Sequence, residues 1–175
     1  YEISAVPFNI TVPGYYIFTR NLEISGASTE AIQVNASDVT IDLNGFTLKG
    51  TNFAGIWQKA GATRLTVRNG CISGLQHAVL AWFEGNRLED LTITDVTDVT
   101  YLGAGAVVRN CIFADHYFRT EFTGVLWLDG GGRVEDCVFF HNRSYNDYPI
   151  KCVRTTNGTE IVRCVFTGGE SLDSV

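Results

Sequence analysis

Short stretches of alternating apolar and polar residues recur along the chain, and each is followed by a sharp turn and a second short stretch. Alternation with a period of two is typical of β-strands, because successive side chains point to opposite faces. Six copies of the pattern follow one another at spacings of 20 to 27 residues: VTIDLNGFTLKG (39–50), LTVRNGCISGL (65–75), LEDLTITDV (88–96), AVVRNCIFADH (106–116), RVEDCVFFHN (133–142) and EIVRCVFTGG (160–169). This self-similarity indicates a repeat architecture built from strands.

A third strand is predicted about a dozen residues before each copy, at 31–34, 55–58, 77–80, 99–102, 125–128 and 150–153. Three short strands per repeat fit one triangular coil of a parallel β-helix, whose coils stack at about 4.8 Å. A propeller blade would need four strands and about 40 residues. We therefore predict an all-β fold, a single-stranded right-handed parallel β-helix of about six coils with no substantial α-helix. The whole chain, 1–175, forms one domain, with an N-terminal cap and first coil at 1–30, repeating coils at 31–169 and a short tail at 170–175.

Asparagine occupies the turn between the second and third strands in several copies, at Asn44, Asn69 and Asn110. A residue in such a turn adopts a left-handed backbone conformation, which Asn tolerates best after Gly. The equivalent positions elsewhere carry Asp90, Asp136 and Val162–Arg163. We therefore expect a stack of Asn amides that is interrupted in the later coils.

One column of the repeat, just after the turn, contains Phe46, Cys71, Leu91, Cys111, Cys137 and Cys164. We expect the four cysteines to stack inside the coils as small buried hydrophobic residues. The alternative is a disulfide between adjacent coils, Cys111 to Cys137 or Cys137 to Cys164, because stacked Cα atoms about 4.8 Å apart lie within bonding range. Five cysteines without a C-x-x-C pair argue against a zinc site.

Composition agrees with this fold and excludes several classes of function. The 47 Val, Ile and Thr residues and 18 Gly suit strands joined by tight turns, and 45% hydrophobic against 18% charged residues excludes disorder. The net charge is −6, and the basic residues are spread singly, so neither nucleic acid nor a membrane is expected as a partner. His77, His116 and His141 lie far apart, so no metal or cofactor is expected. The absence of Met suggests a processed chain or a fragment.

The segments PFNITVPGYYIFTRNLEISG and AIQVNASDVTIDLNGFTLKG resemble the first coils of bacterial and viral right-handed parallel β-helix repeat proteins of the pectin-lyase-like superfamily. The resemblance extends from about Phe8 to Gly169. It implies an extracellular, cell-surface or virion-associated protein, and a substrate groove along the outward face of the first strand of each coil. The superfamily includes lyases, hydrolases, epimerases, viral spikes and binding proteins, so the fold alone does not specify a function.

Strand alternation predicts which side chains line that outward face. With Ile32, Ile56, Ala78, Leu126 and Ile150 inside, the outward residues are Gln33, Trp57, His77, Trp127, Asp129 and Lys151, joined by Lys59 and Tyr101 when the register holds. Trp82 is assigned to the core. Exposed aromatic rings are commonly used to contact sugars, so this face is a candidate binding surface. The alternative is that the aromatic-rich loops at 115–123 and 140–149 cover the rings.

Asp129 and Lys151 are the candidate catalytic residues, with His77 some coils away. A lyase of the resembling type needs carboxylates for Ca²⁺ and a base, and a hydrolase needs converging Asp residues. The chain shows neither signature, so catalysis stays open and we favour its absence. Three functions follow: a non-catalytic module that binds polysaccharide or a partner surface; a trimeric structural protein such as a phage spike, capsid-decoration or appendage component; and a carbohydrate lyase or epimerase using Asp129 and Lys151.

Overall fold

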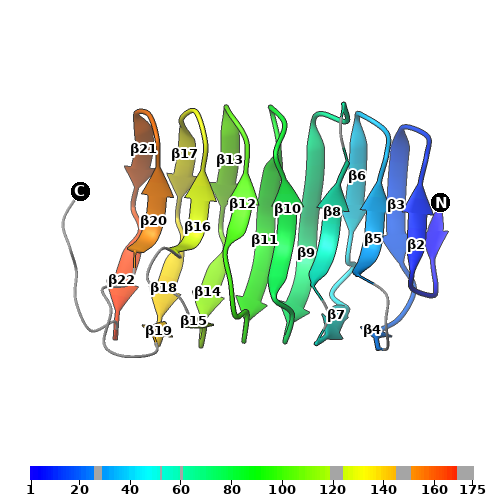
Figure 1. Ribbon diagram of the computed structural model, residues 1–175, viewed down its shortest axis with the longest axis horizontal. Helices are drawn as coiled ribbons and strands as arrows, with labels where there is room; N and C mark the ends of the chain where they lie inside the picture. The colour runs from blue at the N-terminus through cyan, green and yellow to red at the C-terminus, as the bar shows by residue number, and fades with distance from the viewer. Residues whose placement is uncertain (26–28, 52, 60, 119–123, 145–150, 169–175) are drawn as a thin grey trace.

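The computed structural model describes residues 1–25, 29–51, 53–59, 61–118, 124–144 and 151–168. Within these ranges the chain forms β-strands and no helix, and parallel strands stack into a β-solenoid of about six turns. The result is a rod with β1 (Glu2–Ile3) toward one end and β22 (Val165–Thr167) toward the other (Figure 1). The predicted fold class is therefore confirmed. No helix in these ranges is long and apolar enough to cross a membrane.

One side of the rod is a seven-stranded parallel sheet, called here the front sheet, to which each coil contributes one strand (Figure 1). Its strands are β2 (Phe8–Ile10), β5 (Glu30–Val34), β8 (Ala54–Gln58), β10 (His77–Ala81), β12 (Thr100–Leu102), β16 (Gly124–Leu128) and β20 (Lys151–Thr155). Six of these seven strands lie at or within a few residues of the strands predicted between 31 and 153.

The remaining coil strands belong to a thirteen-stranded parallel sheet, called here the back sheet. One path through it contains β1 (Glu2–Ile3), β3 (Gly14–Phe18), β6 (Val39–Asp42), β9 (Leu65–Ser73), β11 (Arg87–Thr94), β13 (Ala106–Arg109), β17 (Gly132–Glu135) and β21 (Thr159–Val162). The other contains β4 (Leu22–Ile24), β7 (Thr47–Gly50), β14 (Ile112–Ala114), β18 (Val138–Phe140) and β22 (Val165–Thr167). A small third sheet pairs β15 (Tyr117–Phe118) with β19 (Arg143–Ser144).

The apolar core fills the inside of the coils. Ile32, Ile56, Ala78 and Leu126 of the front sheet are fully buried there, as the alternation predicted; Ile150 lies outside the described residues. In the last coils, the rings of Phe113, Phe139 and Phe166 stack with centroids 4.9 and 5.0 Å apart. In-register stacking of identical side chains gives each coil the same apolar neighbours above and below.

The turn residues adopt the left-handed conformation predicted for them. Asn44, Asn69 and Asn110 have φ between 52° and 60°, and their replacements Asp90, Asp136 and Arg163 have φ between 51° and 54°. The column of Asn residues is interrupted as expected, but side-chain contacts between coils continue through acidic acceptors: Asp42 beside the turn, and Asp90 and Asp136 in place of the amide. Asn69 Nδ2 donates to Asp42 Oδ1 at 3.0 Å, Asn110 Nδ2 donates to Asp90 Oδ1 at 3.2 Å, and Arg163 Nε donates to Asp136 Oδ1 at 2.7 Å.

The predicted cysteine column is correct for three of its four members. Cys111, Cys137 and Cys164 occupy successive coils, because the Val138 N–H donates to the Cys111 carbonyl and the Val165 N–H to the Cys137 carbonyl, both at 2.9 Å. Cys71 is one residue out of this column. Its register partners are Thr47 and Thr92, and it is half-buried rather than inside. All five cysteines are free thiols.

A packing conflict explains the position of Cys71. Gly70, not Cys71, pairs with Leu91 and occupies the inward position. A Cβ atom on Gly70 would lie 2.4 Å from the Cβ of Leu43, which is fully buried in the preceding coil. Leu43 therefore fills the space that a side chain at position 70 would need, and Cys71 takes the next, outward position.

Candidate functional site

One line of outward-facing side chains crosses the front sheet in register, and we call it the aromatic row. Its members are successive Cα partners in the parallel ladder: Gln33, Trp57, Leu80, Tyr101, Trp127 and Arg154. Gln33, Trp57, Tyr101 and Trp127 thus share one surface, as the alternation predicted. Neighbouring members are one strand apart, about 4.8 Å.

The aromatic row forms an apolar layer of its own outside the coil core. Ala54, Leu80, Val99 and Tyr101 are buried in it, and the half-buried rings of Trp57 and Trp127 pack against them. The loops predicted to cover this layer lie partly at 119–123 and 145–149, outside the described residues. Among the residues that are described, the layer is covered chiefly by its own rings.

Trp82 lies on this surface, so its assignment to the core is wrong. The residue is 51% exposed, and its ring packs against Tyr101 in a tilted arrangement, with centroids 4.2 Å apart and planes 32° apart. Trp82 follows β10, in which Leu80 faces outward and Ala81 inward, so continued alternation turns it outward. Gly103 permits the close approach, since a Cβ atom there would lie 2.3 Å from the Trp82 carbonyl oxygen.

Positively charged groups cover one face of each of the other two tryptophans. Lys59 Nζ lies 3.2 Å from the centroid of the Trp57 ring and also pairs with Glu30 Oε1 at 2.8 Å. Arg154 Cζ lies 3.9 Å from the centroid of the Trp127 ring. Cation–π contacts of this kind hold the rings in place and reduce the ring surface open to a ligand. The most accessible indole on the face is therefore Trp82.

Asp129 is a carboxylate in direct contact with Tyr101 of the aromatic row. It accepts hydrogen bonds from Thr156 Oγ1 at 2.7 Å and Tyr101 Oη at 2.8 Å, which lower its pKa. Burial and the bond to Asp129 raise the pKa of Tyr101 to about 12. At neutral pH, Asp129 is therefore an ionised acceptor and Tyr101 a neutral donor. Two carboxylate oxygens have about four lone-pair directions, so Asp129 retains capacity for a ligand hydroxyl.

The other catalytic candidates lie on a different line of the front sheet. Lys151 is the register partner of Gly124, five residues before Asp129, which separates the two by roughly 16 Å along the strands. His77 pairs with Ala54, donates from Nδ1 to the Val99 carbonyl at 2.8 Å, and has Nε2 3.8 Å from Asp98 Oδ2. Asp129, Lys151 and His77 are thus not brought together. Within the described ranges, no three His, Cys, Asp or Glu side chains are grouped to hold a metal.

A shallow depression of about 330 Å³ lies at the N-terminal end of the same face. Its lining residues are Pro7, Phe8, Asn9, Thr29, Glu30 and Gln33. Because Asn9 is the register partner of Gln33, the depression continues the aromatic row. Burial of Glu30 alone would raise its pKa, but hydrogen bonds from Lys59 and Thr29 outweigh this and lower it. The face therefore offers a charged acceptor at this end as well.

Trp82 and Arg154 are the members of the site that the sequence prediction missed. Alternation from an inward Ala78 would place Leu80 and Trp82 inside, but Ala78 and Val79 both lie in the coil core, and this break in alternation puts Leu80 and Trp82 on the outer face. Arg154 was expected only near Asp129 and Lys151 and was not placed in the row, because the last strand was predicted at 150–153, whereas β20 is Lys151–Thr155 and pairs Arg154 with Trp127. Comparison of the chain with known protein families, curated proteins and solved structures found no match. Its function must therefore be argued from this face.

Proposed function

We propose that the protein is a non-catalytic, polysaccharide-binding β-helix of the pectin-lyase-like type, which holds a glycan chain against its front sheet. The observation that carries the proposal is that all three tryptophans of the chain, Trp57, Trp82 and Trp127, lie on one face around Tyr101. Exposed aromatic surface of this kind marks a contact site, and ring faces pack well against the apolar faces of sugars.

The length of the face favours a polymer over a single sugar. Trp57 and Trp127 are three strand spacings apart, roughly 14 Å, and the depression at Gln33 extends the line further. Lys59, Asp129 and Arg154 border the rings and supply donors and an acceptor for hydroxyl groups. A glycan lying along the rod would therefore meet apolar and polar groups on each successive coil.

The separation of the candidate acid and base groups supports binding over catalysis. General acid–base chemistry requires a base within hydrogen-bonding distance of the proton it removes and a partner acid close to the same substrate bond. Asp129 lies roughly 16 Å from the line of Lys151 and His77, so one sugar unit would not meet them together. A glycan-binding role would suit an extracellular, cell-surface or virion location.

Polysaccharide binding is tested by affinity gel electrophoresis against a panel of neutral and acidic polysaccharides. Wild-type protein should be retarded by at least one of them, and Trp82→Ala should weaken retardation about tenfold, which corresponds to roughly 1.4 kcal/mol. Tyr117→Ala is the matched control, because Tyr117 is 42% exposed but lies on β15, away from the front sheet. Unretarded wild-type protein, or equal retardation of Trp82→Ala and wild type, would contradict the proposal.

A trimeric assembly role is the second candidate, and one observation favours it. Ile112, Val138 and Val165 are register partners on the outer surface of the back sheet, and Ile112 and Val165 are 37% and 50% exposed. Such a row would suit lateral contact between rods. Sedimentation equilibrium tests this candidate: a trimer that dissociates in Val165→Asp would support it, and a monomer at all concentrations would exclude it.

A further inference from the structure

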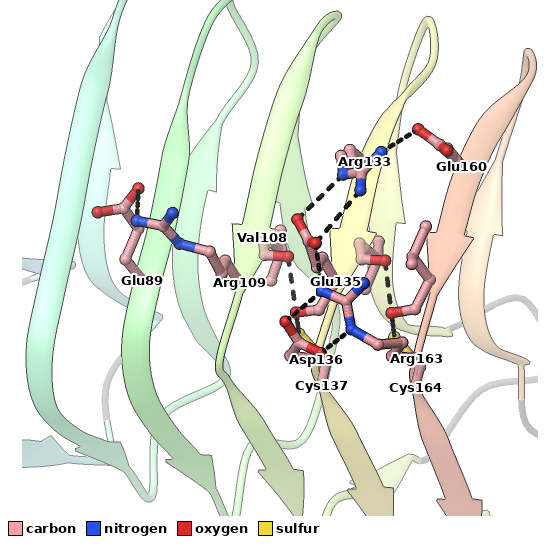
Figure 2. Close-up of polar contacts among 12 residues, drawn as sticks. Glu89, Val108, Arg109, Arg133, Glu135, Asp136, Cys137, Glu160, Arg163 and Cys164 are labelled. Carbon is pink, nitrogen blue, oxygen red and sulfur yellow. Dashed lines mark hydrogen bonds and ion pairs between the residues drawn. The ribbon is translucent and has the colours of Figure 1, made fainter.

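Three cysteines lie above one another at the turn of the back sheet. Backbone hydrogen bonds fix Cys111 beside Cys137 and Cys137 beside Cys164. In-register neighbours in a parallel sheet have Cα atoms about 4.8 Å apart, inside the 4.4–6.8 Å range that a disulfide spans. Figure 2 shows Cys137 and Cys164 side by side beneath the ion pairs of this sheet.

The thiols lean toward the N-terminal end of the rod. Cys164 Sγ lies 3.6 Å from the carbonyl oxygen of Val134, which belongs to β17 in the coil of Cys137. Cys137 Sγ lies 3.7 Å from the carbonyl oxygen of Val108 in the coil before that. The two sulfurs are therefore displaced in the same direction and stay stacked one coil apart.

Burial distinguishes the two pairs that the column allows. Cys111 and Cys137 are fully buried, whereas Cys164 is partly exposed in the last described coil. Of the three stacked thiols, a dissolved oxidant therefore reaches Cys164 first, and its nearest stacked thiol is Cys137. Cys137 lies one coil away in register with Cys164, so its thiol is placed to attack an oxidised Cys164.

We propose that Cys137 and Cys164 are an oxidation site, at which a peroxide joins the last two coils by a disulfide. Peroxide oxidises the Cys164 thiol to a sulfenic acid and is reduced to water. The Cys137 thiolate then attacks the sulfenic sulfur, the S–S bond forms, the S–O bond breaks, and the oxygen leaves as a second water with the thiol proton. The two thiols together lose two electrons.

The bond would fasten the edge of the solenoid. β20, β21 and β22 form the last described coil, and each pairs with a single neighbouring strand among the described residues. Strands at such an edge open more easily than central ones. A link between β18 and β22 opposes that opening, and it does so whether or not the front sheet binds a glycan.

The site is tested by exposing reduced, folded protein to hydrogen peroxide, then alkylating it under denaturing conditions for intact mass and peptide mapping. Two of the five thiols should be lost, with Cys137 linked to Cys164, and the melting temperature should rise in a way that dithiothreitol reverses. Five free thiols after oxidation, or a Cys111–Cys137 link, would overturn the proposal.

Single variants separate the site from unspecific oxidation. Cys71→Ser and Cys152→Ser should still form the link, because both residues lie outside the column. Cys164→Ser should keep its four remaining thiols under the same treatment. Loss of two thiols from Cys164→Ser would show that the exposed member is not required, and would overturn the proposed order of reaction.

Discussion

Asp42 is a nearly buried carboxylate whose oxygens are surrounded by donors. Tyr15 Oη, the Asn44 N–H and Asn69 Nδ2 donate to it at 2.6, 2.8 and 3.0 Å, and Arg68 Nε lies at 2.9 Å. Burial alone would raise its pKa, but these donors outweigh burial and lower it. The folded structure therefore stabilises the ionised carboxylate, and the Asp42 side chain links three successive coils by hydrogen bonds.

Asp42→Asn should destabilise the protein, because the amide cannot accept from all four donors and removes the ion pair with Arg68. The expected loss is about 2–4 kcal/mol of unfolding free energy at pH 7, measured by urea denaturation. A depressed folded-state pKa means that this stability is present above pH 3.8 and is lost as the pH falls further. Asp38→Asn is the control: Asp38 pairs with Arg64 on an exposed surface and should change little. Equal effects of both variants would contradict this account.

His116 is buried in the interior, where its Nδ1 accepts the Val96 N–H at 3.3 Å. Burial lowers its pKa from an ordinary value of 6.5 to about 3. Below pH 6.5 the His116 imidazole therefore binds a proton in the unfolded chain but not in the folded chain. The free energy of unfolding should fall as the pH decreases from 6.5 toward 3, by roughly 2 kcal/mol at pH 5. Urea denaturation at pH 7 and pH 5 measures this loss. It should largely disappear in His116→Gln and persist in His141→Gln, whose side chain is 60% exposed. A loss unchanged in His116→Gln would rule out this source.

A substitution at Gly70 tests whether Leu43 fills the interior space at this position and so displaces Cys71. Gly70→Ala should destabilise by about 1–3 kcal/mol, because its Cβ atom would collide with buried Leu43. Gly158→Ala, where an added Cβ meets nothing within 4 Å, should be nearly neutral. Thermal unfolding of the two variants is the measurement, and similar midpoints would mean that the space at position 70 is not filled as described.

At the scale of elements, the back sheet carries a row of charges that alternate in sign from strand to strand. The register partners are Asp42, Arg68, Glu89, Arg109 and Glu135. Figure 2 shows the C-terminal part of this row, where Arg133 and Arg163 both contact Glu135. These arginines lower the pKa of Glu135 to about 2. The three inner members, Arg68, Glu89 and Arg109, thus have opposite charges on both neighbouring strands, which favours this register over one that pairs like charges.

Arg109→Glu should destabilise the back sheet, because it places an acid between Glu89 and Glu135. Chemical denaturation should show a lower midpoint at low salt and partial recovery at high salt, since salt screens repulsion between exposed charges. Arg20→Glu, on an exposed turn residue outside the row, is the control. A salt-independent loss, or the same loss in Arg20→Glu, would contradict the role of alternation.

The strands and their faces could be predicted from sequence because alternation and repetition are local properties. The same pattern correctly assigned Ile32, Ile56 and Leu126 to the core and Trp57 and Trp127 to the surface. It failed where one residue decides a register, as at Gly70 and in β20. At these positions the register of the strand depends on which side chain of the adjacent coil already fills the interior. That side chain is distant in the sequence, so a local pattern does not reveal it. The cations over Trp57 and Trp127 could not be predicted for the same reason.

At the scale of the whole molecule, the two large sheets present different surfaces. The back sheet carries paired charges, whereas the front sheet carries an apolar layer with Trp82 at its most open point. Pairing within the back-sheet row leaves its charges less available to a ligand. The front sheet combines open ring surface with the Asp129 carboxylate, so binding is expected there.

The most direct measurement of this central claim is intrinsic tryptophan emission during titration with the polysaccharides of the panel. Because all three tryptophans lie on the front sheet, every emitting indole reports on the proposed face. We predict a saturable blue shift, carried mainly by half-exposed Trp82 and absent from Trp82→Phe. A polysaccharide that binds the protein without changing its emission would place the ligand elsewhere and contradict the proposal.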